Sequence, residues 1–578
     1  MLLLPLMAYA TPMPESSCRK VASQFLRSQG RTCDFNTLQL VGDKPGTKSI
    51  VDPGHYYIYN TPGKGFVIVA GDDTVTPVIA YSTSGQFCSD ERMSNFNYWM
   101  GIWSSIIESN RSKGIEASGT TKSEWSRYLE GGSPRAESGD EVLYETALWA
   151  QGDPYNIYCP LLDGERTLTG CVATAMGIVM KYFEWPVAGK GTIPSYTSGG
   201  VTVPELKLGE PYDWKNMPSS LTSGSTEAQK HAVATLLYHA GVIVRARYGT
   251  SGTGAQGENI RQAMVDHMGY DPSATLRRAA MYTSAEWVEM LKNNIKNVGP
   301  TLYGGFNGAG GGHQFVMTGY DASDRFYINW GWGGANNGYY AYPGIGEFTI
   351  EQDAIFNLSK NHGGSYQTEV SLFHGDPSTK PGITLSCAEI VKGVPFSATV
   401  EFFANLGDVP FEGKVGIIRA NSANEVLEVL SEKDFSIEPH WYNSTTIFED
   451  CVITTDAEIG EKLACGYKCN GEDKWSMCRY DLEDASMTGV IPLTDPFTIE
   501  QSTSISYSVE GFLRITSKKG VGLKLLGPGG EDMSSAVSSI DENSWTIDLK
   551  SLSPAKYKIQ LSKDKEFKEI SVSMGLKK

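Results

Sequence analysis

The chain has 578 residues, too many for a single hydrophobic core, so we expect three to five domains. Its 49 basic and 66 acidic residues give a net charge of −17, which disfavours binding to nucleic acid or to anionic lipid. The 40% hydrophobic content, the 63 glycines and the 29 tyrosines favour globular, β-rich modules over a coiled coil or a disordered chain.

The chain begins with a short apolar run that resembles the end of a secretory signal peptide. The run is too short to span a bilayer, and Ala8-Tyr9-Ala10 has the small-x-small pattern of a cleavage site. No basic residue precedes Arg19, so the usual basic start is missing, and a buried first strand is the alternative. We expect residues 1–10 to be a signal peptide remnant of an exported protein that has no transmembrane segment.

Ten cysteines in an exported chain are candidates for disulfide bonds, because the surroundings of such a chain are oxidising. We expect pairing among the nine other than Cys171. Four of these nine are clustered, and no histidine accompanies them at zinc-ligand spacing, which favours disulfides over a metal site. The clustered residues are Cys451, Cys465, Cys469 and Cys478.

A first module is predicted over residues 11–117. It contains a helix at 18–30, strands and turns at 55–87, and a second helix at 95–114. The following residues, 118–141, are polar and rich in serine, glycine and charge, so we predict a processing linker that is open to proteolysis.

A second module, residues 142–365, mixes helices with glycine-flanked strands and holds most of the reactive side chains. Beyond it the sequence alternates short strands with turns and has no long helix. This pattern predicts two β-sandwich-like domains, at residues 366–495 and 496–578.

Cys171 stands at the start of a predicted helix in the second module. Apolar residues recur at helical spacing after it, forming one buried stripe, and Pro186 ends the pattern. The unpaired N–H groups and positive dipole of a helix start favour a thiolate, so Cys171 is a candidate nucleophile whose own N–H can stabilise an oxyanion. A small buried cysteine or a disulfide partner is the alternative.

His313 is the histidine best placed to act as a base for such a thiol. Six glycines between Gly304 and Gly312 lead into a predicted strand that begins at His313. Glycines there let a substrate backbone approach closely, which makes Gly310, Gly311 and Gly312 a candidate substrate loop. A phosphate-binding loop is the alternative, but no Gly-Lys-Ser/Thr follows. His313 lies 142 positions after Cys171, within the roughly 130–150 spacing of papain-like enzymes.

The strand after His313 is expected to return through a tight hairpin. A four-residue turn at Asp321–Asp324 would place Tyr320 opposite Arg325 and Phe315 opposite Trp330. Strand alternation then predicts the relative orientation of the residues at the far end of the hairpin.

On this register Trp330 shares the face of His313, whereas Asn329 points to the other face unless a bulge intervenes. Either residue could orient the imidazole, and the alternation favours Trp330. Gln151, twenty residues before Cys171, could supply a second oxyanion donor through its side-chain amide. Alone, it would be an ordinary loop residue.

These motifs, in this order, resemble the streptopain family of bacterial papain-like cysteine endopeptidases. A further stretch in the first module, residues 65–82, resembles the inhibitory propeptide of that family. The tail lies outside the resemblance. The segments of the second module that carry it are residues 149–160, 169–186, 212–218, 310–321 and 328–334.

The resemblance implies an α+β architecture with a papain-like catalytic domain at residues 142–365, in which a helical half bears Cys171 and a β-barrel half bears His313. An N-terminal α+β propeptide would precede it, and all-β sandwich domains would follow. Cys171 carries over as nucleophile, His313 as general base and acid, and Gln151 as oxyanion donor. Trp330 would orient and shield the histidine, with Asn329 as the alternative.

The function implied is a cysteine endopeptidase made as a zymogen, with no metal and no cofactor. It would be secreted by a bacterium or held at the bacterial cell surface, with the periplasm as the alternative location. Its partners would be protein or peptide substrates and its own propeptide, which covers the cleft until a cut within the linker. Lys122 and Arg127 are candidate trypsin-like sites, and self-cleavage is the other route. One alternative is an inactive papain-like adhesin or scaffold that binds protein through its β-rich tail. The other is an enzyme with the same site that catalyses acyl transfer or amide hydrolysis on a non-protein substrate.

Overall fold

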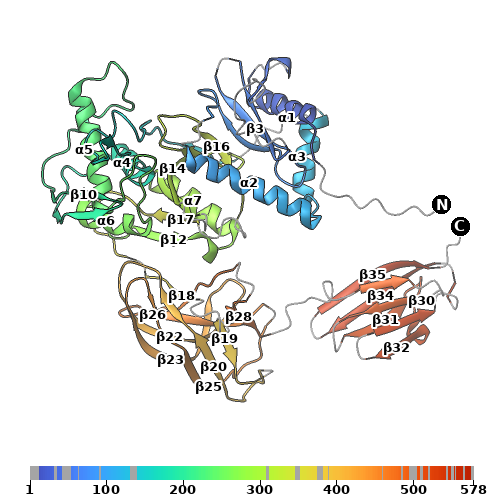
Figure 1. Cartoon of the computed structure of the whole chain (residues 1–578). Coiled ribbons are helices and arrows are strands. Elements are labelled where there is room, and N and C mark those ends of the chain that lie inside the picture. The colour runs from blue at the N-terminus through green and yellow to red at the C-terminus, as the bar shows by residue number, and fades with distance from the viewer. Residues whose placement is uncertain are drawn as a thin grey trace.

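The fold is taken from a computed structural model, shown as a ribbon in Figure 1. Residues 1–11, with the expected signal remnant, lie outside the described ranges. The structure describes residues 12–31, 35–41, 54–62, 64–89, 93–130, 139–306, 312–344, 352–366, 368–373, 382–387, 390–458, 460–482, 486–493, 504–507, 512–517, 521–541, 544–548, 552–553, 555–563 and 566–574.

The first module packs three helices against a four-stranded antiparallel meander. Helix α1 forms where apolar residues recur at helical spacing, and it buries Val21, Phe25 and Leu26. The helices are α1 (Glu15–Ser28), α2 (Ser94–Lys113) and α3 (Gly119–Glu130), and a 3-10 turn covers Phe35–Thr37. The strands are β1 (Gln39–Leu40), β2 (Tyr56–Asn60), β3 (Phe66–Ala70) and β4 (Val78–Ser82).

Helix α3 corrects the prediction of a linker at 118–141. Residues 119–130 are helical because Trp125 and Tyr128 lie on one face and are buried in the first module. The indole Nε1 of Trp125 also donates to the carbonyl of Val75 at 2.9 Å. Residues 131–138 of the predicted linker lie outside the described ranges.

The second module has a helical half and a β half, as the papain-like fold requires. Its helices are α4 (Cys171–Phe183), α5 (Glu227–Ile243), α6 (Glu258–Met268) and α7 (Ser284–Asn297), with 3-10 turns at Trp214–Asn216 and Ala279–Met281. The strands of the β half are β5 (Val142–Leu143), β12 (Thr275–Arg278), β13 (Thr301–Phe306), β14 (Gly312–Tyr320), β15 (Arg325–Asn329), β16 (Gly338–Ala341) and β17 (Gln352–Phe356). Short hairpin strands are β6 (Leu161–Leu162), β7 (Glu165–Arg166), β8 (Thr192–Ile193), β9 (Tyr196–Ser198), β10 (Val201–Val203) and β11 (Leu206–Lys207).

One antiparallel sheet runs through both modules. Its strand order is β1-β2-β3-β4-β16-β15-β14-β13-β17-β12, with β5 added on β14. The two modules meet where Tyr81 and Ala80 of β4 pair with Tyr339 and Tyr340 of β16. A single hydrophobic cluster therefore extends from Cys18 to Phe356, while a second cluster fills the helical half.

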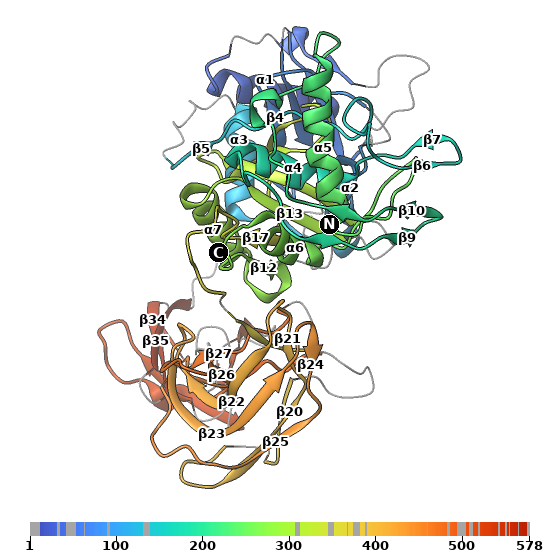
Figure 2. The same ribbon diagram turned by 90° about the vertical axis from the view of Figure 1, so that its left-hand side faces the viewer.

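The remaining chain forms two β modules with separate cores. We call the first, residues 368–493, the proximal β module; Figures 1 and 2 both place it below the β12 end of the second module. It contains β18 (Val370–Leu372), β19 (Gly382–Leu385), β20 (Phe396–Glu401), β21 (Phe403–Asn405), β22 (Phe411–Ala420), β23 (Val426–Ile437), β24 (Trp441–Tyr442), β25 (Thr446–Cys451), β26 (Lys462–Cys469), β27 (Ser476–Met477) and β28 (Val490–Pro492). The last module contains β29 (Ser504–Tyr507), β30 (Phe512–Thr516), β31 (Gly522–Leu526), β32 (Val537–Asp541), β33 (Ser544–Asp548), β34 (Ala555–Lys563) and β35 (Glu566–Met574), with a 3-10 turn at Ser534–Ala536.

The nine cysteines within the described residues all carry free thiols, which contradicts the expected disulfides among them. Several fill apolar cores as small hydrophobic side chains. Burial raises the pKa of Cys18 and of Cys159 to about 12, so both remain protonated thiols near neutral pH. Cys33 lies outside the described ranges. Among the helices of the described ranges, none has the length and apolar character needed to cross a bilayer.

Candidate active site

Cys171 is the first residue of α4, as the sequence predicts. Gly170 caps the helix with a φ of 87°, and an added Cβ there would lie 2.5 Å from the carbonyl oxygen of Thr253, so only glycine fits. The helix is buried on all sides from Val172 to Met180 instead of along one stripe, because α5 and the strands β13 and β14 enclose it.

The thiol of Cys171 is held in its neutral form. Burial raises its pKa above the ordinary value, while backbone hydrogen bonds from Gln314 and Val172 act in the opposite direction. Burial is the larger effect, so the favourable position at the helix start does not by itself produce a thiolate in this state.

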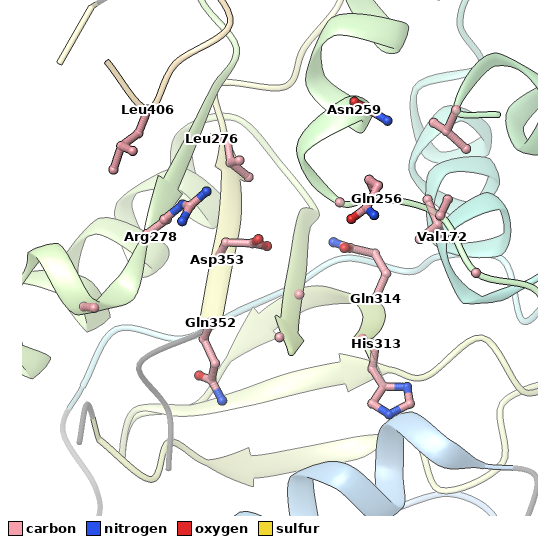
Figure 3. Close-up of a pocket in the computed structure, with 18 of the residues that line it drawn as sticks. Val172, Gln256, Asn259, Leu276, Arg278, His313, Gln314, Gln352, Asp353 and Leu406 are labelled. Atoms are coloured by element: carbon pink, nitrogen blue, oxygen red, sulfur yellow. The ribbon is translucent and has the colours of Figure 1, made fainter. Parts of the chain in front are cut away.

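His313 is the second residue of β14, and its imidazole is also neutral. Burial lowers the pKa of His313 to about 4. Figure 3 shows its ring directed toward α2, whereas the neighbouring Gln314 points to the opposite side, toward Gln256. The ring centroid of His313 lies 5.4 Å from that of Tyr98 on α2.

Cys171 and His313 line one cavity of about 900 Å³. No hydrogen bond joins the thiol to the imidazole in the described part of the chain. The two groups therefore face a common cleft without forming a pair. Of the candidate substrate loop, Gly312 lines this cleft, and Gly310 and Gly311 lie outside the described ranges.

Trp330 lies on the face of the hairpin predicted for it. Its ring contacts Phe315 with centroids 4.9 Å apart, and its indole Nε1 donates to the carbonyl of Asn336 at 3.1 Å. Near the turn the expected register is wrong, because Tyr320 faces Phe326 and not Arg325. A bulge between Met317 and Gly319 compensates for this one-residue shift.

Asn329 points away from the imidazole and holds a different segment. Its side-chain Nδ2 donates to the carbonyl of Ala147 at 2.9 Å and to Thr146 at 3.0 Å. Its Oδ1 accepts from the backbone N–H of Gly331 at 3.1 Å. Asn329 therefore anchors the segment that leads toward Gln151.

Gln151 is buried and lies next to the residues that precede Cys171. Its backbone carbonyl accepts a hydrogen bond from the N–H of Thr169 at 3.1 Å. Thr169 is two residues before Cys171, so Gln151 is positioned beside the start of α4.

Helix α2 of the first module contributes the side chains that sequence reasoning missed. Asn95 donates from Nδ2 to the carbonyl of Trp330 at 2.7 Å, and its Oδ1 accepts from the indole of Trp332 at 2.8 Å. Trp99 is fully buried and packs edge-on against Phe315. The aromatic residues of α2 could have indicated that this helix packs against another part of the chain. A single sequence does not show which surface they cover.

Comparison with known proteins agrees with this arrangement. The family model described as Peptidase C10 family matches residues 149–340, which contain both cleft residues, Cys171 and His313. A second model, described as Spi protease inhibitor, matches residues 10–107, which include most of α2.

Individual relatives extend the comparison. The thiol protease/hemagglutinin PrtT of Porphyromonas gingivalis is 28% identical over 58% of this chain, which spans 39% of that protein's length. Streptopain of Streptococcus pyogenes is 27% identical over 52% of this chain and 76% of its own length.

A solved structure of active interpain A cysteine protease from Prevotella intermedia is similar to 38% of this chain. It is 32% identical, 95% of its own chain is covered, and the TM-score is 0.35. The family match, with the thiol protease and streptopain relatives, shows that residues 149–340 belong to the peptidase C10 family, the streptopain-like cysteine peptidases.

Proposed function

We propose that the protein is an exported cysteine endopeptidase made as a zymogen, with Cys171 as nucleophile and His313 as general base and acid. The observation that carries this proposal is the cleft, which is lined by a cysteine at a helix start and a histidine at the mouth of a strand. Family membership supports the same reaction class.

In the zymogen, α2 holds the histidine side of the cleft in an inactive arrangement. Tyr98 packs against the imidazole, and the side-chain amide of Asn95 donates a hydrogen bond to the carbonyl of Trp330. Because burial favours the neutral forms of both Cys171 and His313, the ion pair that would attack a peptide is not formed.

Removal of α2 would expose His313 to water and let its ring turn toward Cys171. His313 then takes the thiol proton, and the thiolate attacks the carbonyl carbon of the substrate peptide bond. The oxyanion is held by the N–H of Cys171 and the side-chain amide of Gln151. His313 protonates the leaving amine, and water, deprotonated by His313, hydrolyses the thioester.

We place the activating cut between α3 and β5. Lys122 and Arg127 both lie inside α3, where a protease would first have to unwind the helix.

Labelling of the active thiol tests the proposed reaction. The activated protein should cleave casein, and an epoxide thiol inhibitor should modify Cys171, as located by mass spectrometry. Cys171→Ala should abolish both results, whereas the matched control Cys88→Ala, which removes an exposed thiol, should preserve them. Intact casein and an unlabelled Cys171 would instead favour an inactive adhesin.

A further inference from the structure

The proximal β module forms part of the cleft that contains Cys171. Figure 3 shows Leu406 of this module facing Leu276 and Arg278 of the catalytic module. Three of the residues that it contributes, Phe373, Leu406 and Met487, are half-buried and so retain apolar surface. The residues of the β module that line the cavity are Leu372, Phe373, Leu406, Asp481 and Met487.

Ion pairs with little exposed surface hold the β module on the catalytic module. Arg261 of α6 lies 3.8 Å from the carboxylate of Asp408, and Arg277 of β12 lies 3.7 Å from that of Glu369. Glu369 also accepts a hydrogen bond from the hydroxyl of Tyr282 at 2.9 Å. The far wall of the cleft is therefore fixed in position by the catalytic module itself.

A row of aromatic side chains leads from this wall to the surface. The Phe373 ring lines the cavity and stacks on Tyr442, with centroids 5.2 Å apart and planes at 27°. Tyr442 stacks in turn on Trp441, at 5.7 Å and 13°. Trp441 is 63% exposed and Tyr442 is 38% exposed. Stacked aromatic rings with this much exposed surface are typical of binding sites.

The row is held rigidly with respect to the cleft. Trp441 pairs with Asn405 along the ladder between β24 and β21. The preceding His440 contacts Asp408 at 2.9 Å, and Asp408 is the same carboxylate that faces Arg261. Rings held in place before binding lose little conformational freedom when a partner is bound.

We propose that Phe373, Tyr442 and Trp441 form an exosite for the polypeptide substrate, which binds apolar and aromatic side chains remote from the scissile bond. This inference rests on the proposed peptidase function. The row of aromatic rings is continuous with the cleft. We therefore infer that it binds an extended segment of the same substrate polypeptide whose peptide bond is cut in the cleft. Long unfolded substrates would then be preferred over short peptides.

Kinetics on two substrates test the exosite. The activated full-length chain is assayed on reduced, alkylated casein and on a short fluorogenic peptide amide. For the double variant Trp441→Ala/Tyr442→Ala, kcat/KM on casein should fall about ten-fold, mainly through KM, as for loss of an aromatic hot spot. On the short peptide it should stay within about two-fold. The control is Leu427→Ala, which removes an apolar side chain of the same module that is 50% exposed.

An equal loss of kcat/KM on both substrates would overturn the exosite, because the aromatic side chains would then only maintain the structure of the cleft. No loss on either would overturn it as well. Binding of fluorescently labelled, alkylated casein to the Cys171→Ala chain, with and without the double substitution, separates this proposal from the proposed function. Binding that depends on Trp441 in a chain without catalysis supports the exosite even if casein is never cut. Binding of an oligosaccharide in place of casein would overturn it.

Discussion

At the residue scale, the placement of Gln151 beside the residues preceding Cys171 has a direct kinetic consequence. In the proposed mechanism, the side-chain amide of Gln151 would donate to the oxyanion in the transition state and would leave the thiol itself unchanged. The buried position of Gln151 and its backbone bond to Thr169 keep it close to α4.

We expect Gln151→Ala to slow catalysis by about 10²–10³, the range for loss of one oxyanion donor, while Cys171 is still labelled by the epoxide. Steady-state kcat on a short peptide and mass spectrometry of the labelled protein measure the two effects. An unchanged kcat would remove Gln151 from the site.

The imidazole of His313 makes the zymogen sensitive to acid. Burial lowers its pKa from the ordinary value of 6.5 to about 4, so burial in the zymogen selects the neutral ring. The contribution of this neutral ring to zymogen stability is therefore complete above pH 6.5 and is lost as the pH falls toward 4.

We expect the melting temperature of the full-length Cys171→Ala chain to decrease when the pH is lowered from 7 to 4.5. The loss should be smaller when His313→Gln is added, because glutamine does not titrate. Differential scanning calorimetry of the two chains at both pH values measures the difference. Equal losses would show that other groups set the acid sensitivity.

At the scale of elements, α2 packs against the histidine side of the cleft through Asn95 and several aromatic side chains. Asn95 binds both the carbonyl of Trp330 and the indole of Trp332, while Trp99 fills the space between α2 and the hairpin. Loss of one buried hydrogen-bonding partner typically costs about 1–3 kcal/mol.

We expect Asn95→Ala to weaken the hold of the propeptide and to raise the rate of activation several-fold. Ser105→Ala, a substitution on the same helix, is the control and should change nothing. Gel analysis of the time course of processing, at equal protein concentrations, measures the rates. A rate equal to that of the control would mean that Trp99 and its neighbours alone hold the helix.

The hairpin between β14 and β15 shows what sequence reasoning can supply. Strand alternation correctly placed Phe315 beside Trp330, since Val316 pairs with Asn329 and the rings of Phe315 and Trp330 lie 4.9 Å apart. It failed near the turn because the carboxylate of Asp321 accepts the N–H of both Ser323 and Arg325 at 2.9 Å, which closes a longer loop. A bulge then restores the register, and no residue type marks where a bulge will form.

The prediction of a linker where α3 forms was wrong for a different reason. Only Trp125 and Tyr128 of its residues are buried, so the segment has the polar composition of a linker. Its helical state depends on tertiary packing against the first module, which composition does not reveal. The start of α4 could be predicted because its signals are local: a glycine, a cysteine and a continuous apolar run.

At the scale of the whole molecule, the order of the modules along the chain could be predicted from residue patterns and motifs. The contacts between the modules could not. The pairing of β4 with β16 joins residues about 260 positions apart, and nothing local to either strand names its partner. The same holds for the docking of the proximal β module, which depends on Arg261 and Arg277 meeting carboxylates far along the chain.

The shared sheet has a consequence for how activity begins. A cut between residues 130 and 139 would break the covalent link, but the ladder between β4 and β16 and the packing of Trp99 would remain. The severed fragment would then be a tightly bound ligand of the enzyme, and its escape would follow a dissociation constant. Cleaved protein at high concentration would therefore show no peptidase activity, and dilution below the dissociation constant would start the reaction.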